Sequence, residues 1–557
     1  MEKVKEFLQG VEVDQRTAAL LTAAAGAVGA VVLLVHKLYI HQDAKAKIQK
    51  ARNRRTASLQ RAEHAVLRYK TSHPGNDSAF ILALSLSELT KKLQEGLLSP
   101  EDVLYSYMEK ALDVNKDLNC CTGILLESFD QLKTSNKEGL LYGVPISIKE
   151  NYAYKNHDSS CGVIINLDQP AKKDSVLVQV LKRQGAIPFV KTNLPQGLLS
   201  YDCGNPIYGQ TVNPHSLQKT SGGSSGGEGA LIGGGGSLLG LGSDVGGSIR
   251  IPASFCGICG FKPTAGRLSS LGLSPIYRGQ KSVPSCPGPM ARDVDSLALC
   301  MEALLCDHMF ALDPTVPPIP FNVQTYQSFS QPSPSMLRSV REVKALLEQA
   351  GHTLVPYTPL KVSHVMVELI VKGIFADGAA TLCQKLEGCP LDPCLRFQVL
   401  PYYLPSWLKK TLSVVLKMLS PRTSEILNAI SGDYIQETIA EWRRCNIDVL
   451  LCPVIGPAYN LFYCGKLTCF ASYTILYNLL NFPAGVVTVS TVKAEDEEEL
   501  EHYKGVYGDY IDKYFKQAVS GGEGLPMAVQ CVSLPWQDEH CLRFMKEVEQ
   551  LVKQSTV

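Results

Sequence analysis

Short apolar runs of strand length alternate with amphipathic stretches of helical length along most of this chain. Residues 144–148 form an apolar run, residues 186–191 indicate another strand, and residues 175–184 between them have the spacing of a helix. The same alternation returns near the C-terminus, where residues 524–532 indicate a strand and residues 539–552 a closing helix. This order predicts an α/β fold in which helices cover a mixed or mostly parallel β-sheet.

Capping and turn residues predict where several elements begin and end. The sequence Ser-Pro-Glu-Asp at residues 99–102 is a strong helix start, because it combines an N-cap hydroxyl, an early proline and two acids. We expect this helix to run to about residue 114. Residues 287–294, PGPMARDV, have the chemistry of a turn that leads into a helix over residues 294–305. A helix over residues 337–350 and a strand over residues 353–357 follow.

Residues 17–35 carry no charge across 19 positions, which is close to the length that a membrane-spanning helix needs. We predict a transmembrane helix over residues 17–36, preceded by an N-terminal tail of residues 1–16; a buried or amphipathic alanine-rich helix is the alternative. Lysine and arginine are concentrated after this segment, at Lys37, Lys45, Lys47, Lys50, Arg52, Arg54 and Arg55. Because positive flanks stay on the cytoplasmic side, we expect the rest of the chain in the cytosol.

A basic linker over residues 37–80 separates this segment from the predicted catalytic domain, residues 81–557. Within it, residues 44–72 predict a helical arm that contacts the domain through Ala51, Leu59, Ala62, Val66 and Leu67. Residues 404–419 have an apolar helical face flanked by lysines, a pattern shared by interfacial membrane helices and ordinary core helices. From periodicity alone, the two interpretations are equal.

Composition limits the possible partners and cofactors. A formal net charge of +1 argues against nucleic acid as the main partner. The 18 cysteines follow no disulfide-like spacing, so we expect them to be mostly reduced. Cys256 and Cys259 form a single C-x-x-C pair without a second pair at zinc spacing, which is a weak metal signal. We therefore expect no metal and no other cofactor.

Residues 221–253, SGGSSGGEGALIGGGGSLLGLGSDVGGSIRIPA, are rich in glycine but threaded with apolar side chains, so the segment must be packed. Clustered hydroxyls mark both ends, with Ser224 and Ser225 near the start and Ser248 after two glycines. Free backbone amides before a serine can stabilise an oxyanion. We hypothesise a serine nucleophile with its oxyanion hole; a glycine-rich core loop without catalytic function is the alternative.

Lys149 ends the predicted strand over residues 144–148. Lysine is rarely buried without a partner, and desolvation lowers its pKa enough to make it a general base at neutral pH. The alternative is a lysine that extends its ammonium group to solvent from the end of the strand.

Three chemical interpretations of the glycine-rich segment compete. The sequence GGSSG matches a nucleophile elbow with Ser224 as nucleophile, but residues 211–220 are too polar to predict the required strand, and no histidine stands in a marked context. A phosphate-binding loop lacks the Gly-Lys-Ser/Thr ending. The third interpretation joins Lys149, Ser224 and Ser248, in which a neutral lysine accepts a proton from a bridging serine and that serine accepts one from the attacking serine.

The chain resembles the amidase signature family at this point. The similarity is carried by GGSSGGEGALIGGGGSLLGLGSDVGGSIRIPA, by GVPISIKEN upstream, and by CGICGFKPTAGRLS and GPMARDVDSLALC downstream. The segments LLYGVP, SYDCGNPIYGQTVNP, SYTILYNLLNFPAGVV and AVQCVSLPWQ resemble the branch of that family that hydrolyses fatty acid amides, and this resemblance runs from about residue 17 to the end.

The resemblance implies a role for each matching residue. Ser248 matches the acyl-forming nucleophile, Ser224 the bridging serine and Lys149 the base. The oxyanion hole corresponds to Val245, Gly246, Gly247 and the Ser248 backbone. Supporting positions correspond to Ser225, Asp244 and Arg250, and apolar positions near the acyl pocket to Leu198 and Leu199.

The family also implies a large mixed twisted β-sheet enclosed by helices, usually in a homodimer, with a membrane-binding cap around residues 400–420. We therefore predict a single-pass hydrolase on an intracellular membrane of the endoplasmic reticulum or Golgi type. It would cleave primary fatty acid amides and N-acylethanolamines to fatty acid and amine. The chain departs from the family pattern at residues 326–336 and is shortened at residues 429–441. A catalytically impaired lipid-binding variant and a short-chain amidase are the alternatives.

Overall fold

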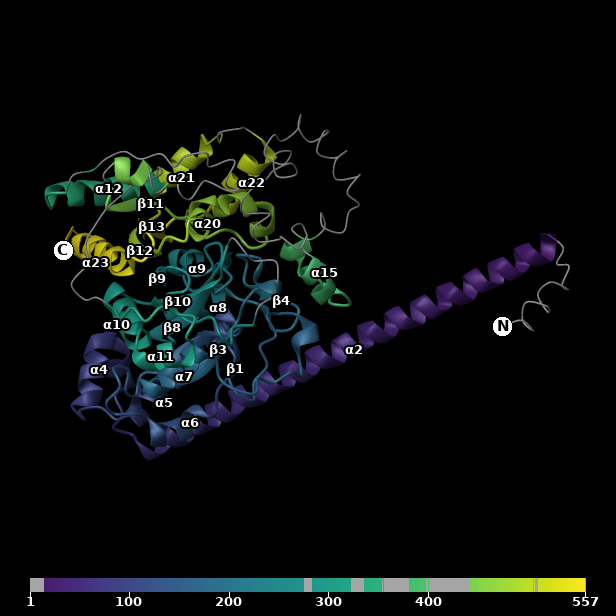
Figure 1. Cartoon of the computed structure of the whole chain (residues 1–557), viewed down its shortest axis with the longest axis horizontal. Coiled ribbons are helices and arrows are strands. Elements are labelled where there is room, and N and C mark those ends of the chain that lie inside the picture. The colour runs from purple at the N-terminus through teal and green to yellow at the C-terminus, as the bar shows by residue number, and fades with distance from the viewer. Residues whose placement is uncertain are drawn as a thin grey trace.

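A nine-stranded sheet with helices around it forms the body of the molecule (Figure 1). The computed structural model describes residues 15–274, 283–321, 335–352, 380–396, 441–445, 447–503 and 509–555, together with the single positions 354, 399, 438 and 505. The strands of the main sheet are, in spatial order, β1 (Cys121–Ile124), β3 (Ile187–Thr192), β2 (Pro145–Lys149), β8 (Leu239–Asp244), β10 (Cys286–Ala291), β9 (Cys259–Lys262), β12 (Ala484–Thr491), β13 (Pro526–Ser533) and β11 (Val449–Pro453).

The sheet is mixed, which confirms the predicted fold class. Strand β2 runs parallel to both β3 and β8, whereas the other neighbouring pairs are antiparallel. Two short ribbons lie outside it, formed by β4 (Gly204–Asn205) with β5 (Gly209–Gln210) and by β6 (Val212–Asn213) with β7 (Ser216–Thr220). The segment before Ser224 therefore does contain a strand, although that strand belongs to a separate ribbon.

The α-helices that accompany the sheet are α2 (Gln15–Ser72), α3 (Ser78–Ala83), α4 (Leu86–Gln94), α5 (Pro100–Leu118), α6 (Ser128–Gln131), α7 (Val176–Arg183), α8 (Gly226–Gly233), α9 (Arg250–Cys256), α10 (Val294–Leu304), α11 (Asp307–Leu312), α12 (Ser335–Gln349), α15 (Ala380–Leu386), α20 (Ser472–Leu479), α21 (Ala494–Glu501), α22 (Tyr510–Val519) and α23 (Asp538–Ser555). Helix α5 begins where its capping sequence predicts, because the Ser99 side chain accepts hydrogen bonds from the amides of Glu101 and Asp102.

Packing on both faces of the sheet explains why its central strands are continuous apolar runs. On β12, Val487 joins a buried cluster with residues of α23, and the adjacent Val486 joins a second cluster with residues of α9. Successive strand residues point to opposite faces, so the sheet lies between two layers. The first helical turn of α8 and the end of β2 meet within this core, and both lead into the predicted catalytic residues.

The segment predicted to be a turn at residues 287–294 is instead β10, and this prediction was wrong. Its residues pair with β8 from Cys286↔Asp244 to Ala291↔Leu239. On its other side, β9 pairs only with Met290 and Ala291. Pro287 lies where that second edge has no strand partner, so its missing N–H costs no ladder hydrogen bond. The prolines therefore made this segment resemble a turn in the sequence, although the sheet accommodates it as a strand.

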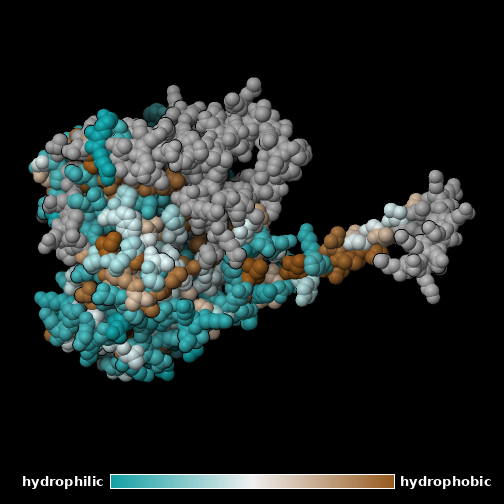
Figure 2. All heavy atoms as spheres, viewed as in Figure 1, coloured by the Kyte–Doolittle hydropathy of each residue, from teal (hydrophilic) through white to brown (hydrophobic). Residues whose placement is uncertain are grey.

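Helix α2 is one continuous 58-residue helix, where the sequence predicted a transmembrane helix followed by a separate arm. Its N-terminal half projects away from the body and exposes apolar side chains along its length (Figures 1 and 2). Among the described residues, this is the one helix that is long and apolar enough to cross a membrane by length and composition.

The C-terminal half of α2 lies against the body. Ala51, Ala62 and Val66 are buried as the sequence predicted and Leu59 is partly buried, but Leu67 is 66% exposed and makes no such contact. Polar contacts reinforce the packing, including ion pairs from Arg54 to Asp158 at 2.7 Å and to Asp168 at 2.5 Å. The helix is thus attached to the body by a docked face.

Several predictions lie outside the described residues. These are the basic amphipathic helix at 404–419, the strand at 353–357, and the departures from the family pattern at 326–334 and 429–437.

Candidate active site

Lys149 is the last residue of β2, and its side chain is completely buried. Its Nζ atom lies 2.7 Å from the Ser224 Oγ atom. It also donates to the Ser243 carbonyl oxygen at 3.2 Å and to the Ser243 Oγ atom at 3.0 Å. The parallel arrangement of β2 and β8 brings Lys149 and Ser243 to the same end of the sheet. The lysine therefore does not reach solvent, and its alternative interpretation from the sequence is wrong.

The surroundings of Lys149 favour its neutral form. Burial lowers the pKa of the lysine to about 7, although the negative charges of Asp244 and Glu228 oppose this shift. No carboxylate forms a salt bridge with Lys149 among the described residues. A lysine in this state can accept a proton near neutral pH.

Ser224 lies two residues before α8, and its side chain is 3% exposed. The backbone on both sides of it is held closely. Gly222 has a φ of +78°, and a Cβ atom there would lie 2.8 Å from the Pro252 Cα atom of α9. Glycine satisfies both demands, since it tolerates positive φ and permits close backbone contact. The glycines before Ser224 therefore position this serine beside Lys149.

Ser248 lies in the turn between β8 and α9 and is half-buried. Its carbonyl oxygen accepts a hydrogen bond from the Ser225 amide at 3.0 Å. Its hydroxyl makes no hydrogen bond to another residue that the structure describes. The structure thus joins Lys149 directly to Ser224, and it links the segment of Ser248 to that of Ser224 through the backbone.

The turn before Ser248 presents backbone amides. Within the described chain, the amides of Val245, Gly246 and Ser248 donate no hydrogen bond, which leaves them available to an oxyanion. The Gly247 amide, by contrast, donates to the Asp244 Oδ1 atom at 2.8 Å. Gly247 instead shapes the turn, with a φ of +118° and no room for a Cβ atom, which would lie 2.3 Å from the Thr474 Oγ1 atom.

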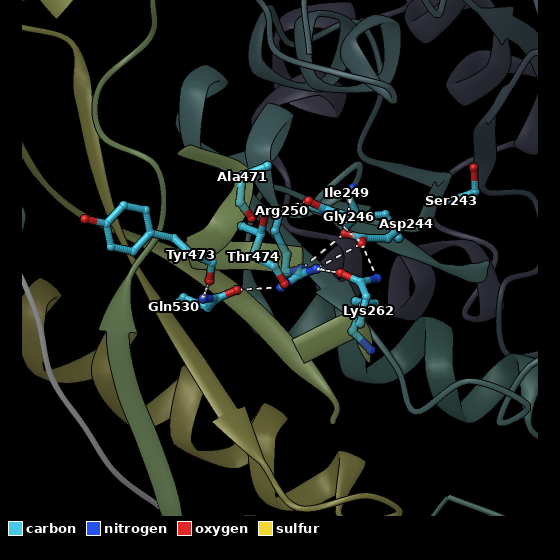
Figure 3. A network of polar contacts seen from close by, with 12 residues as sticks. Ser243, Asp244, Gly246, Ile249, Arg250, Lys262, Ala471, Tyr473, Thr474 and Gln530 are labelled. Carbon is cyan, nitrogen blue, oxygen red and sulfur yellow. Dashed lines mark hydrogen bonds and ion pairs between the residues drawn. The ribbon is translucent and has the colours of Figure 1, made fainter. Parts of the chain in front are cut away.

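A buried ion pair holds this turn in place (Figure 3). Both Asp244 and Arg250 are fully buried, and the Arg250 Nη2 and Nε atoms donate to the Asp244 carboxylate at 2.9 and 3.1 Å. Burial alone would raise the pKa of Asp244, but the Arg250 guanidinium and several hydrogen bonds hold that pKa well below its usual range. Asp244 is therefore a fixed negative charge that orients the turn.

Helix α20 and strand β13 complete this network. The Arg250 Nη1 atom donates to the Thr474 carbonyl oxygen at 2.8 Å and to the Gln530 Oε1 atom at 2.6 Å. Thr474 in turn donates its hydroxyl to the Gly246 carbonyl oxygen at 2.6 Å (Figure 3). Asn478 donates to the Asp244 Oδ1 atom at 2.8 Å. Distant parts of the chain thus fix both ends of the turn.

The remaining predicted site residues lie around this centre. The Ser225 hydroxyl is buried between neighbouring backbones and accepts a hydrogen bond from the Ser243 amide at 3.3 Å. Leu198 and Leu199 are half-buried and pack against an apolar cluster that includes Cys161 and Leu386. That cluster supplies apolar surface near the site.

Sequence reasoning missed Ser243, Thr474, Asn478 and Gln530. A weak signal existed for two of them, because Thr474 and Asn478 are polar residues four positions apart in a mostly apolar helix. Gln530 similarly interrupts the apolar strand β13. A buried polar residue needs a partner, so each of these positions implied a contact whose identity the sequence did not give.

Replacing Arg250 tests whether the ion pair supports the fold. In Arg250→Met, the Asp244 carboxylate would stay buried without its charged partner, which typically costs about 3–5 kcal/mol. We expect a clearly lower unfolding midpoint in thermal denaturation. The double variant Arg250→Met/Asp244→Leu removes both charges and should recover part of the loss.

Arg54→Met is the matched control for this prediction. Arg54 also contacts two carboxylates, but its side chain is 47% exposed, and exposed pairs contribute about 0–1 kcal/mol. Equal unfolding midpoints for Arg250→Met and Arg54→Met would contradict a structural role for the buried pair.

Comparison with known proteins shows to which family the chain belongs. A family model described as Amidase matches residues 102–542. Fatty-acid amide hydrolase 1 of Sus scrofa is 49% identical over 536 residues, covering 91% of this chain and 93% of that protein. The vitamin D3 hydroxylase-associated protein of Gallus gallus is 50% identical over 448 residues, covering 78% of this chain and 96% of that protein.

A solved structure of a fatty acid amide hydrolase has the same fold. It superimposes with a TM-score of 0.74 at 25% sequence identity, covering 92% of this chain and 96% of that one. The family match includes β2, the glycine-rich segment and the turn with its ion pair. The chain therefore belongs to the amidase family and is a hydrolase of that family.

Proposed function

We propose that this hydrolase cleaves fatty acid amides, both primary amides and N-acylethanolamines, to a free fatty acid and an amine. The observation that carries the proposal is the buried Lys149, whose Nζ atom lies 2.7 Å from the Ser224 Oγ atom next to the turn that bears Ser248. The names of two relatives, both fatty acid amide hydrolases, support this substrate class.

The first half of the reaction forms an acyl-enzyme. Neutral Lys149 accepts the proton of the Ser224 hydroxyl, and Ser224 accepts that of Ser248 as the Ser248 Oγ atom attacks the amide carbonyl. This relay requires the hydroxyls of Ser248 and Ser224 to come within hydrogen-bond distance when the substrate binds, because no hydrogen bond joins them among the described residues. The oxyanion is stabilised by the amides of Val245, Gly246 and Ser248, where each lost donor costs about 10²–10³-fold in rate.

Collapse of the tetrahedral intermediate breaks the carbon–nitrogen bond. The proton taken up by Lys149 returns through Ser224 to the leaving nitrogen, which departs as a neutral amine. A water molecule then attacks the acyl carbon and gives a proton to the same relay. Ser248 recovers its proton as the fatty acid is released, so each group returns to its starting state.

The lipid character of the substrate is supported by two features. Leu198 and Leu199 pack into an apolar cluster that could continue as an acyl-binding surface. The exposed apolar half of α2 suits a membrane anchor, and we propose that residues 17–36 span the membrane with the catalytic body in the cytosol. An intracellular membrane of the endoplasmic reticulum type and a homodimer belong to the same proposal, on the family resemblance alone.

Replacing Ser248 tests the nucleophile. We expect Ser248→Ala to lose covalent labelling by a fluorophosphonate probe and to lose about 10⁴–10⁶-fold in the rate of oleamide hydrolysis, because no other group can form the acyl-enzyme. Both are measured on the purified full-length protein, and peptide mapping of the labelled wild type should place the adduct on Ser248.

Ser87→Ala, which changes an exposed serine on α4, is the control and should label like the wild type. Labelling that persists in Ser248→Ala would exclude the proposed mechanism. A wild-type protein that does not label would instead favour the catalytically impaired lipid-binding variant.

A series of acyl-chain lengths tests the substrate class. Each methylene that is buried on binding contributes about 0.8 kcal/mol, so kcat/KM should rise steeply from acetamide to oleamide until the acyl site is filled. Hydrolysis is followed by release of ammonia across the series. A preference for acetamide would identify a short-chain amidase, as the names of two more distant relatives, acetamidases at 28% and 27% identity, make reasonable.

The pH dependence of the reaction tests the base. Lys149 must be neutral to accept a proton, and burial lowers its pKa to about 7. We therefore expect kcat/KM to fall about tenfold per pH unit below pH 7 and to level off above it. Lys149→Ala should be slow at every pH and should lack this acid limb. An acid limb that Lys149→Ala retains would assign it to another group.

A further inference from the structure

Glu228 is a fully buried carboxyl group that the proposed mechanism does not use. It lies in the first turn of α8, the helix that follows Ser224. The Ser147 hydroxyl donates to its Oε2 atom at 2.5 Å, and the Thr192 hydroxyl donates to its Oε1 atom at 2.6 Å. No cation among the described residues forms a salt bridge with it. A buried carboxyl is costly, so this arrangement calls for an explanation.

The two hydroxyls that hold Glu228 both belong to neighbours of Lys149 in the sheet. Ser147 precedes Lys149 by two residues on β2 and so points to the same face of the sheet. Thr192 is the direct partner of Lys149 on the neighbouring β3. The carboxyl group of Glu228 thus bridges the two strand positions that flank the catalytic lysine.

A third strand leaves space for this bridge. Gly240 on β8 is the partner of Ser147, and a Cβ atom on Gly240 would lie 1.9 Å from the Glu228 Oε2 atom. Any side chain there would therefore expel the carboxyl group. The buried Glu228 carboxyl group therefore occupies a site formed by three adjacent strands. Strands β2 and β3 each supply a hydroxyl, and β8 supplies the space beside Gly240.

The same contacts determine how α8 sits relative to β2. The Gly227 amide at the start of α8 donates to the Asn193 carbonyl oxygen at 3.0 Å, immediately after β3. Together with Glu228, this contact fixes the first turn of α8 on the ends of β2 and β3. Ser224 lies two residues before that turn, and Lys149 is the last residue of β2. The distance between their reacting atoms depends on this docking.

We propose that Glu228 is a positioning residue for the reaction, one that holds the turn of α8 against β2 and β3 so that Ser224 meets Lys149. The inference rests on the proposed Ser-Ser-Lys mechanism and adds a residue to it.

Charge gives Glu228 a second effect on Lys149. Burial raises the pKa of Glu228 to about 7, while the nearby Lys149 lowers it. When ionised, Glu228 favours the protonated form of Lys149, so a neutral residue at 228 should lower the pKa of the lysine.

The groups around Glu228 leave Lys149 as its main electrostatic partner. Tyr152, which follows β2, is buried and donates its hydroxyl to the Gly242 carbonyl oxygen. Burial raises the pKa of Tyr152, and the charge of Glu228 raises it further. From β8 and α9, Asp244 and Arg250 pair with each other. The neutral groups that contact Glu228 are the hydroxyls of Ser147 on β2 and Thr192 on β3.

The central test is Glu228→Gln, which keeps the shape of the side chain and removes its charge. We expect kcat to fall about 10²-fold with KM changed little, because misplacement of a reacting group by about 1 Å has that effect. The acid limb of kcat/KM should move to lower pH. The fluorophosphonate labelling rate should follow kcat, and its final extent should equal that of the wild type.

Glu549→Gln is the matched control. Glu549 on α23 is also a buried carboxyl whose pKa is raised by burial, and it pairs with Lys553 at 3.3 Å. This variant should keep the wild-type kcat and acid limb. If Glu228→Gln lowers only the extent of labelling and the thermal midpoint, with rate per labelled site and acid limb as in the wild type, Glu228 is merely structural and the proposal is overturned.

Ser147→Ala keeps the test decisive if Glu228→Gln does not fold. It removes one of the two hydrogen bonds and leaves the carboxyl group in place, so we expect labelling about tenfold slower. An unchanged labelling rate in Ser147→Ala would overturn the proposal. Labelling that persists in Ser248→Ala would defeat the proposed function itself, and that outcome is distinguishable from either failure at Glu228.

Discussion

The burial of one lysine that forms no salt bridge with the described residues is the constraint on which the rest of the site depends. Lys149 ends a strand with no exposed surface, so its charge is opposed by desolvation and its Nζ atom must find oxygen partners inside the protein. Ser224 and Ser243 supply them. The core that makes β2 a stable strand is therefore the same core that lowers the pKa of its last residue.

The site separates two buried charges by giving them opposite surroundings. Asp244 lies beside the Arg250 guanidinium, which keeps the carboxylate ionised and its turn rigid. Lys149 has hydroxyl and carbonyl oxygens instead, so it can lose its proton. Both residues are fully buried, and the difference lies in the partners. The charge that holds the turn is paired, whereas Lys149, which we propose as the proton acceptor, forms no salt bridge with any described residue.

Sequence alone predicted the elements whose signal is local. Strands β2 and β3 are apolar runs because both faces are buried, and Ser99 identified the start of α5 through its capping chemistry. Within the glycine-rich segment, α8 and β8 were not predicted, because glycine has low propensity for either element and close backbone contacts stabilise them. Strand β10 was mistaken for a turn because it contains two prolines. The sheet accommodates them because β9 pairs with β10 only at Met290 and Ala291.

The candidate site shows the same limit at longer range. Lys149, Ser224 and Ser248 could be proposed because residue type and motif carry their chemistry. Arg250, however, bonds to Asn478 and Gln530, which are 228 and 280 residues further along the chain, and no periodicity links such positions. The surroundings of Glu228 likewise could not be predicted from the sequence. They consist of the hydroxyls of two residues on β2 and β3 and the space beside Gly240 on β8, which come together only in the folded sheet. Residue type and local motif thus indicate the candidate catalytic residues, whereas the geometry of the candidate site arises only in the assembled sheet.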